Sequence, residues 1–248
     1  MGGSRDDLYR EAGQGESNFA FDSNVAGVFG DMVRRSVPGY QEIQDLIKKL
    51  APAFIQPRTS VFDLGCSLGT TLREIARVAD QEDVAIIGID SSQPMIDQAR
   101  LQTRNELPDD SRLQFRKADI LTELDIAGAS VVVMCLVLQF IRPPHRARLL
   151  REVRAGMVPG GCLLMVEKTV QPNARLDALY IDSFHAFKAA NGYLATEIAR
   201  KRVALENVLV PYSDEENRAL LSQAGFDSVS TFYQWLNFTG YIAIAGEQ

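Results

Sequence analysis

Hydrophobic runs of strand length recur through the first two-thirds of the chain, at 59–66, 84–90, 112–119, 129–140 and 162–168. Segments with the three- to four-residue apolar spacing of amphipathic helices separate them, at 70–80, 93–106 and 143–157. The runs at 129–140 and 162–168 carry few polar residues, which is typical of strands covered on both faces. Strands that alternate with helices predict a doubly wound α/β sheet whose strands are mostly parallel.

The last third of the chain has a different pattern. From 172 to about 224 the spacing is mostly helical, and we expect residues 172–210 to cover the carboxyl edge of the sheet, where such sheets bind ligands. Two β-rich runs follow in 227–246 and divide near Leu236 and Asn237 without a helix between them. They predict a closing antiparallel β-hairpin.

One helical segment of this cover, at 195–208, places a permanent cation beside its apolar stripe. At about 100° per residue, Ile198, Arg202 and Leu205 lie on one side of the helix. Arg202 is therefore either a snorkelling side chain that pairs with Glu206 at the surface, or a ligand for an anion. A guanidinium can bind a carboxylate through two parallel hydrogen bonds, and the pattern alone leaves both interpretations open.

Other side chains of the cover also have expected roles. Arg200 faces solvent in the same projection, and Lys201 follows Glu197 by four residues, the spacing of an ion pair on a helix surface. Aromatic side chains here form either the dry wall of a ligand site or plain helix packing. They are Tyr180, Phe184, Phe187 and Tyr193.

Composition and charge bound the class of protein. The chain has 248 residues, of which 46% are hydrophobic and 23% charged, and no apolar run reaches the roughly 18 residues that span a bilayer. These values predict one cytoplasmic domain over 19–248, after a polar, flexible segment at 1–18. The net charge of −6 disfavours direct binding of nucleic acid, which rewards basic surfaces.

Cysteines and histidines are few. Cys66, Cys135 and Cys162 fall in or beside predicted strands, a placement that gives neither a disulfide framework nor a paired metal motif. His145 and His185 lie far apart in the sequence, so a histidine-based zinc site is not expected. We therefore expect no metal site and a reducing compartment.

The glycine-containing turn DLGCSLG, at 63–69, follows the first predicted strand and admits four interpretations. As G-x-S-x-G it matches a nucleophile elbow, although the first strand is an unusual place for one. As a dinucleotide-binding loop it lacks the middle glycine of G-x-G-x-x-G. It also fits a nucleoside-binding turn, in which Gly65 lets the backbone approach a ligand and Asp63 anchors the loop, or a tight turn without a ligand.

Aspartates end the next two strands. Asp90 lies 21 residues after the glycine turn, where a carboxylate suits the two hydroxyls of a ribose. Its alternative role is to cap the following helix, which Ser91 or Ser92 serves equally well. Asp119 can accept from the exocyclic amine of adenine while Ile120 covers the ring, or it is an ordinary loop aspartate.

These three stretches together resemble the class I S-adenosylmethionine-dependent methyltransferase fold. GMVPGGCLLMVEK, at 156–168, adds the PGG turn that this family often carries before its fifth strand. The resemblance covers roughly residues 58–170. It implies a Rossmann-like α/β domain that binds S-adenosylmethionine, with a mostly parallel seven-stranded sheet, an antiparallel C-terminal hairpin and a helical cover at 172–210.

A closer resemblance lies in the flanks. RRSVPGY, FKAANGY and KRVALENV, like DLGCSLG and IDSSQPMI, are similar to the carboxy-S-adenosyl-L-methionine synthase family over about residues 19–240. Members of that family convert S-adenosylmethionine and prephenate to carboxy-S-adenosylmethionine and phenylpyruvate, and a separate enzyme uses the product on wobble uridine in tRNA. The resemblance implies a cytoplasmic homodimer that needs no metal and binds neither membrane nor nucleic acid directly.

The resemblance also assigns roles to residues. Tyr40 lines the ligand pocket and Arg202 pairs with the carboxylate of the product, so these two are the candidate catalytic residues. The remaining implied contacts are Gly65, Cys66 and Ser67 to the methionine part, Asp90 and Ser91 to the ribose, Asp119 and Ile120 to the adenine, and Cys135 at the end of the fourth strand.

The sequence departs from this family at several positions. Cys135 stands where the family has an asparagine that contacts the ligand, and a thiol cannot supply the hydrogen bonds of an amide. FHAFK, at 184–188, retains one of two paired histidines, and Trp235 stands at a frequent cysteine position. These departures keep two alternatives open: a small-molecule methyltransferase that uses S-adenosylmethionine, and a synthase whose product feeds another pathway. A third class is a non-catalytic module that binds S-adenosylmethionine.

Overall fold

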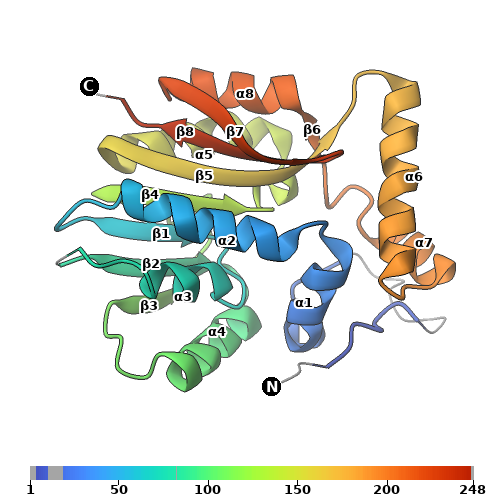
Figure 1. Ribbon diagram of the computed structural model, residues 1–248, viewed down its shortest axis with the longest axis horizontal. Helices are drawn as coiled ribbons and strands as arrows, with labels where there is room; N and C mark the ends of the chain where they lie inside the picture. Colours follow the sequence, from blue (N-terminus) through green and yellow to red (C-terminus); the bar gives the residue numbers. More distant parts are fainter. Residues whose placement is uncertain (1–3, 11–18, 82, 247–248) are drawn as a thin grey trace.

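A mixed β-sheet between two layers of helices forms the body of the structure, which is a computed structural model that describes residues 4–10, 19–81 and 83–246 (Figure 1). The strand order is β3-β2-β1-β4-β5-β8-β7, and β6 pairs with β5 beside this path. The strands are β1 (Ser60–Leu64), β2 (Ala85–Asp90), β3 (Leu113–Lys117), β4 (Ala129–Cys135), β5 (Met157–Val170), β6 (Tyr212–Ser213), β7 (Ser228–Trp235) and β8 (Phe238–Ile244).

The helices alternate with the strands through most of the described chain. They are α1 (Ser23–Ser36), α2 (Tyr40–Leu50), α3 (Thr70–Ala76), α4 (Gln93–Glu106), α5 (Pro143–Gly156), α6 (Ala174–Ala190), α7 (Ala195–Ala204) and α8 (Asp214–Gln223). Short 3-10 turns are η1 (Ala51–Ala53) and η2 (Leu138–Phe140). Asp22 caps α1 and Asn173 caps α6 through their side-chain oxygens, which fixes where these two helices begin.

The predicted sheet topology is confirmed. Neighbouring strands from β3 to β5 run parallel, and β8 is antiparallel to both β5 and β7. The two-residue strand β6 is an addition to the seven strands expected, because two residues are too short to give a sequence pattern.

The fourth strand is shorter than its apolar run predicts. It ends at Cys135, and η2 follows within the predicted strand 129–140. The reason is the buried carboxylate of Glu167, which accepts hydrogen bonds from the backbone N–H groups of Val137, Leu138 and Gln139 at 3.0, 2.7 and 2.9 Å. These bonds satisfy backbone donors that a strand would otherwise pair, and they bend the chain toward the carboxyl edge.

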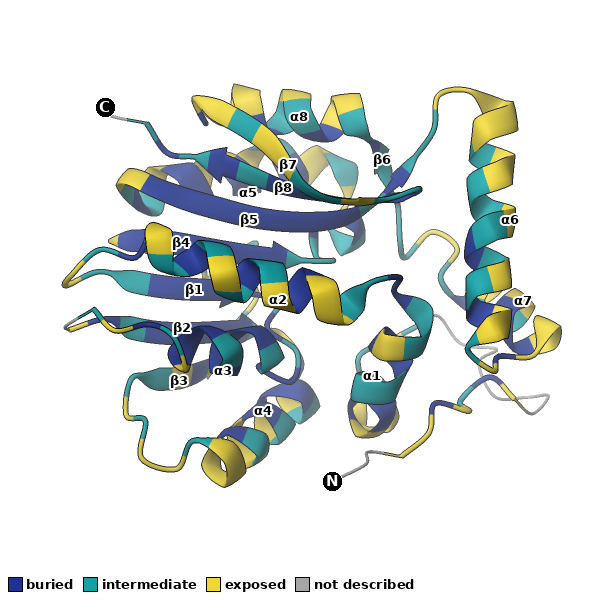
Figure 2. Cartoon of the chain, viewed as in Figure 1, coloured by how far each residue is buried: buried dark blue, intermediate teal, exposed yellow. Residues whose placement is uncertain are grey.

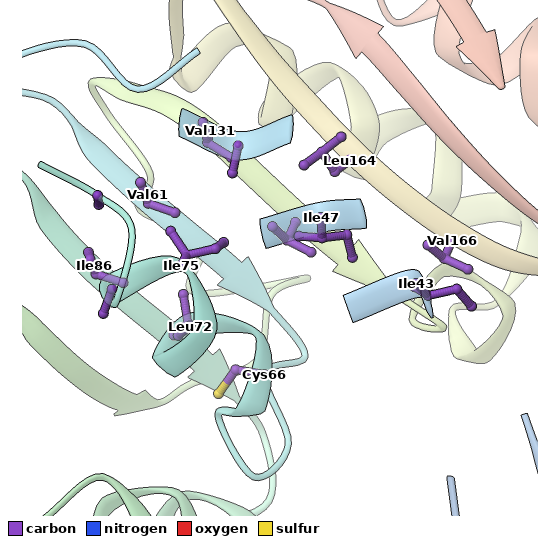
Figure 3. Close-up of a cluster of buried hydrophobic side chains, with 14 of the residues drawn as sticks. Ile43, Ile47, Val61, Cys66, Leu72, Ile75, Ile86, Val131, Leu164 and Val166 are labelled. Atoms are coloured by element: carbon purple, nitrogen blue, oxygen red, sulfur yellow. The ribbon is translucent and has the colours of Figure 1, made fainter. Parts of the chain in front are cut away.

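Two apolar clusters hold the layers together. Ile43 and Ile47 of α2 and Ile75 of α3 pack with Val61 and Val131 on one face of the sheet (Figure 3). The cluster on the other face joins α5 and α8 to the alternate residues of the same strands. Strands covered on both faces are buried along most of their length, which explains their continuous apolar runs (Figure 2).

Three helices lie beyond the carboxyl ends of the parallel strands: α1, α6 and α7 (Figure 1). The predicted helical cover over 172–210 is therefore present as α6 and α7. Much of α6 is exposed, and among its described side chains only Phe184 and Lys188 are buried (Figure 2). The inner side of this helix consequently faces the edge of the sheet where ligands of such folds bind.

Part of the N-terminal segment is packed against the cover. Asp6 and Tyr9 are buried, and the Asp6 carboxylate accepts a hydrogen bond from the Tyr193 hydroxyl and lies 3.5 Å from Lys201 Nζ. Residues 4–10 thus differ from the flexible lead-in expected over 1–18, because a buried ion pair holds them. Residues 1–3 and 11–18 lie outside the described residues.

In the described ranges, no helix combines the length and apolar character needed to cross a membrane.

Candidate active site

A cavity of about 850 Å³ opens at the carboxyl edge of the sheet, between the strand ends and α1, α6 and α7. All ten residues predicted as ligand contacts line it. They are Tyr40, Gly65, Cys66, Ser67, Asp90, Ser91, Asp119, Ile120, Cys135 and Arg202. The structure therefore brings the predicted set together, although their individual contacts with a ligand stay predictions.

The glycine turn is shaped for close approach of a ligand. Gly65 has φ +77°, and a Cβ there would lie 2.6 Å from a methyl carbon of Val137. The N–H groups of Gly65 and Cys66 both donate to the carbonyl of Ile89, at 2.8 and 3.0 Å. A side chain at Gly65 would therefore be strained by its backbone and would clash with Val137.

The nucleophile-elbow interpretation finds no support at this turn. The Ser67 hydroxyl donates weakly to the Gly65 carbonyl at 3.5 Å, and neither histidine of the described chain hydrogen-bonds to it. A serine nucleophile needs such a base, so the turn does not assemble a hydrolase triad.

Asp90 orders the turn from the neighbouring strand. Its two carboxylate oxygens accept hydrogen bonds from the N–H groups of Ser67 and Ser92, at 2.9 and 2.8 Å. Ser92, rather than Asp90, caps α4 by accepting from the Met95 N–H, so the capping alternative for Asp90 is wrong. Burial raises the pKa of Asp90, and the residue lines the cavity.

Asp63 has a different role from the one expected. Its side chain is buried at the end of β1, yet within the described chain no hydrogen bond reaches its carboxyl group, so it does not anchor the loop. Burial and the charge of Asp90 raise the pKa of Asp63 to about 8. A carboxyl group of this kind is suited to a cationic ligand, because a cation would stabilise its charged form.

Asp119 makes a loop contact and also lines the cavity, while its contact with adenine stays a prediction. One carboxylate oxygen accepts from the Leu121 N–H at 2.9 Å, which is the contact of an ordinary loop aspartate. The residue also lines the cavity, beside the buried side chain of Ile120.

Tyr40 and Cys135 lie deep in the cavity, close to Asp63. Burial raises the pKa of both groups well above their usual ranges, so the phenol and the thiol stay protonated near neutral pH. Tyr40 starts α2 directly after Gly39, whose left-handed conformation turns the chain from α1 into α2. Neither side chain is poised as an anionic base.

The wall formed by the helical cover is cationic. Lys168 at the end of β5, Lys188 of α6, and Lys201 and Arg202 of α7 all line the cavity. The ring of Phe184 contacts the first two, with its centroid 5.0 Å from Lys168 Nζ and 4.3 Å from Lys188 Nζ. Burial and the other three cations lower the pKa of Lys188 to about 7.

Arg202 is exposed and lines the cavity without an acidic partner. No ion pair of 4.0 Å or less joins it to Glu206 or to any other carboxylate of the described residues. The surface-pair alternative is therefore wrong, while anion binding stays a prediction.

The neighbours of Arg202 differ from expectation. Lys201 pairs with Asp6 rather than Glu197. Arg200 donates to the carbonyls of Tyr9 and Arg10, at 2.9 and 2.8 Å, instead of facing solvent. Both expectations failed because residues 4–10 cross the helix, which no local pattern shows.

Among the four aromatic candidates of the cover, only Phe184 lines the cavity. Phe187 packs against Trp235, with ring centroids 5.8 Å apart, and Tyr193 binds Asp6. In the described part of the chain, no group of three or more histidine, cysteine, aspartate or glutamate side chains is placed to hold a metal ion.

Comparisons with known proteins agree with this geometry. Residues 61–161 match the model of the methyltransferase domain family. A carboxy-S-adenosyl-L-methionine synthase of Desulfotalea psychrophila is 41% identical over 98% of each chain, and one of Shewanella amazonensis is 42% identical over 98% of this chain and all of that one. The chain belongs to the carboxy-S-adenosyl-L-methionine synthase family. It is therefore a transferase enzyme with the class I methyltransferase fold.

Solved structures support the fold of this synthase-family member. An O-methyltransferase family protein from Burkholderia thailandensis aligns with a TM-score of 0.67 at 21% identity, covering 91% of this chain and 60% of that one. Magnesium protoporphyrin IX methyltransferase from Synechocystis aligns with a TM-score of 0.60 at 13% identity, covering 86% of both chains.

Proposed function

We propose that this synthase-family member joins S-adenosylmethionine to the carboxyl group of prephenate, forming carboxy-S-adenosylmethionine and phenylpyruvate. The observation that carries the proposal is the division of charge within one cavity. Asp63, Asp90 and Asp119 line it from the strand ends, and the lysines and Arg202 line it from the cover. S-adenosylmethionine carries cationic sulfonium and ammonium groups, whereas prephenate is a dianion. Each substrate thus matches one wall.

The acidic wall fits S-adenosylmethionine. Asp90 holds the glycine turn and lines the cavity, where a carboxylate suits the ribose hydroxyls. Asp63 offers a buried carboxyl that no described donor satisfies, which suits a cation. Ile120 supplies an apolar surface for the adenine ring beside Asp119.

The reaction balances without a further reactant. Prephenate loses its ring carboxylate as carbon dioxide and its hydroxyl as hydroxide, and the ring becomes aromatic. The hydroxide takes a proton from the sulfonium methyl group to give water. The resulting carbanion, stabilised by the adjacent sulfur, forms a carbon–carbon bond to the carbon dioxide.

For this chemistry the enzyme must position the two substrates, exclude water from the cavity and stabilise the charges that develop. Tyr40 and Cys135 stay neutral, so neither competes with the hydroxide for the methyl proton. Phe184 and Phe238 also line the cavity and provide apolar surface there. Arg202 then binds the carboxylate that distinguishes product from substrate.

We also propose a wider setting for the reaction. The product serves a separate enzyme that carboxymethylates wobble uridine in tRNA, and the synthase itself acts in the cytoplasm as a homodimer without binding nucleic acid. The exposed apolar side chains of the cover are candidates for the dimer contact. They are Leu176, Leu179, Leu194 and Val203.

The test is to incubate the purified enzyme with S-adenosylmethionine and prephenate and to analyse the products by mass spectrometry. We expect a sulfonium heavier than S-adenosylmethionine by the mass of carbon dioxide, with one phenylpyruvate per product. Formation of S-adenosylhomocysteine and a methylated acceptor would instead establish a small-molecule methyltransferase. Recovery of unreacted S-adenosylmethionine alone would indicate a binding module.

A further inference from the structure

We propose that Lys168 and Lys188, which both lie against the ring of Phe184, form a subsite that binds the 2-oxo acid carboxylate of the donor, the one retained in phenylpyruvate. The inference rests on the proposed function and assigns each donor carboxylate to a place in the cavity. The departing ring carboxylate then lies away from the lysine pair, toward S-adenosylmethionine.

The two lysines come from different elements. Lys168 follows Glu167 at the end of β5, and because residues alternate along a strand, Lys168 faces the cover while Glu167 binds the η2 backbone. Lys188 is 8% exposed and lies on the inner side of α6. Both ammonium groups lie within 5.0 Å of the centroid of the Phe184 ring, which packs edge-on against Phe238 with ring centroids 5.3 Å apart.

Neither ammonium group has an acidic partner in the described chain. No carboxylate lies within 4.0 Å of either Nζ, whereas Lys201 nearby is paired with Asp6. Buried lysines are rare unless they are paired. Mutual repulsion is evident at Lys188, whose pKa is lowered by burial and by Lys168, Lys201 and Arg202. A bound carboxylate would give the ammonium groups a partner and would offset the repulsion between them.

The chemistry of decarboxylation decides which donor carboxylate belongs here. A carboxylate paired with ammonium groups is stabilised as an anion, and its loss as neutral carbon dioxide would break those pairs. The lysine pair would therefore slow the reaction if it held the ring carboxylate. Holding the side-chain carboxylate instead anchors the donor without opposing the bond that breaks.

The experiment compares Lys188→Met and Lys168→Met with the control Lys49→Met, which changes an exposed lysine of α2 outside the cavity. For each protein we would measure the KM for prephenate, inhibition by phenylpyruvate and the Kd of S-adenosylmethionine by calorimetry. We expect KM and the phenylpyruvate inhibition constant to rise together by about 10- to 100-fold in both cavity variants, with the Kd changed less than about threefold. Lys168→Arg should recover much of the loss.

Several outcomes would overturn the subsite. A raised KM with unchanged inhibition by phenylpyruvate would place the departing carboxylate at the lysines, and an unchanged KM would remove the lysines from donor binding. Where a variant folds poorly, inhibition of the wild-type enzyme provides the test. The methyl ester of phenylpyruvate should inhibit it at least about tenfold more weakly than the acid does. Failure of the proposed function is distinguishable, since the wild-type enzyme would then form no carboxylated sulfonium.

Discussion

The acidic and basic walls of the cavity are built in different ways. The acidic wall consists of residues at the ends of consecutive strands, and Asp90 holds its loop through two backbone N–H groups. The basic wall joins side chains from β5, α6 and α7, and it is supported from outside by the Asp6–Lys201 pair. A ligand site can therefore combine one wall that the sheet topology dictates with another that depends on how a separate cover packs.

The largest expected effect is on the acidic wall. Asp90→Ala removes the acceptor for the N–H groups of Ser67 and Ser92 as well as the proposed ribose acceptor. Charge-assisted hydrogen bonds contribute about 1.5–3 kcal/mol each, so the affinity for S-adenosylmethionine should fall by at least about 100-fold in calorimetry. Asp97→Ala, an exposed change on α4, is the control. A loss under about threefold at Asp90 would show that the wall does not hold the nucleoside.

A second measurement, on a variant of Arg202, should distinguish the contribution of the basic wall to ligand binding from that of the acidic wall. Arg202→Ala is expected to weaken binding of carboxy-S-adenosylmethionine by about 10- to 100-fold, because it removes a charge-assisted pair with the extra carboxylate. The Kd of S-adenosylmethionine should change less than about threefold. Arg175→Ala, on the exposed start of α6, is the matched control. Equal losses for both sulfonium compounds would contradict the assigned role.

When no anion is bound, the basic wall should lower the free energy of unfolding of the protein. Lys188 has a pKa of about 7 in the folded protein, well below its value of about 10.5 when unfolded. The unfolded chain therefore binds more protons between these values, and this lysine destabilises the fold most below pH 7. Lys188→Met should raise the free energy of unfolding at pH 7 by about 1–3 kcal/mol in urea titrations.

The same stability gain should shrink as the pH rises above 7 and vanish above about pH 10.5, where the folded and the unfolded wild-type chains both carry a neutral lysine. Lys168, Lys201 and Arg202 face Lys188 and stay in both proteins, so the difference between the two isolates one group. A variant less stable than the wild type at every pH would show that Lys188 is a structural residue.

The smallest effect concerns the departure from the family at Cys135. Cys135→Asn would restore an amide at the end of β4, where the cavity is lined by Tyr40 and Asp63. One neutral hydrogen bond contributes about 0.5–1.5 kcal/mol, so the product Kd should fall about two- to tenfold. Cys162→Ala, in the core away from the cavity, gives a control for loss of a thiol. Weaker product binding in Cys135→Asn would indicate that the cavity has adapted to the smaller side chain.

The acidic wall was predictable because strand ends and turns occur in a fixed order along the chain. Parallel strands bring their carboxyl ends to one edge, so the glycine turn, Asp90 and Asp119 were expected together. Gly65 was also predictable, since a ligand-facing turn requires a residue without a side chain. The position of Asp63 was predicted correctly, but its role was not, because a sequence cannot show which hydrogen-bond donors lie near a side chain.

Of the basic wall only Arg202 was predictable, and its helical projection left open whether the side chain pairs with Glu206 at the surface or binds an anion. Lys168 follows a long apolar strand and Lys188 belongs to an amphipathic helix, so each has the pattern of an ordinary surface lysine. Their meeting around Phe184 depends on the angle between α6 and the sheet. Residues 4–10 are polar and gave no local signal, yet they redirect Arg200 and Lys201.

The most direct test of the two-wall account traces the carboxyl carbon. Prephenate labelled with carbon-13 at its ring carboxylate would be supplied with S-adenosylmethionine and an excess of unlabelled bicarbonate. If both substrates are held together in one water-excluding cavity, the label should pass into carboxy-S-adenosylmethionine without dilution, as read by mass spectrometry. Product diluted by carbon from bicarbonate, or label found only in solution, would contradict the account.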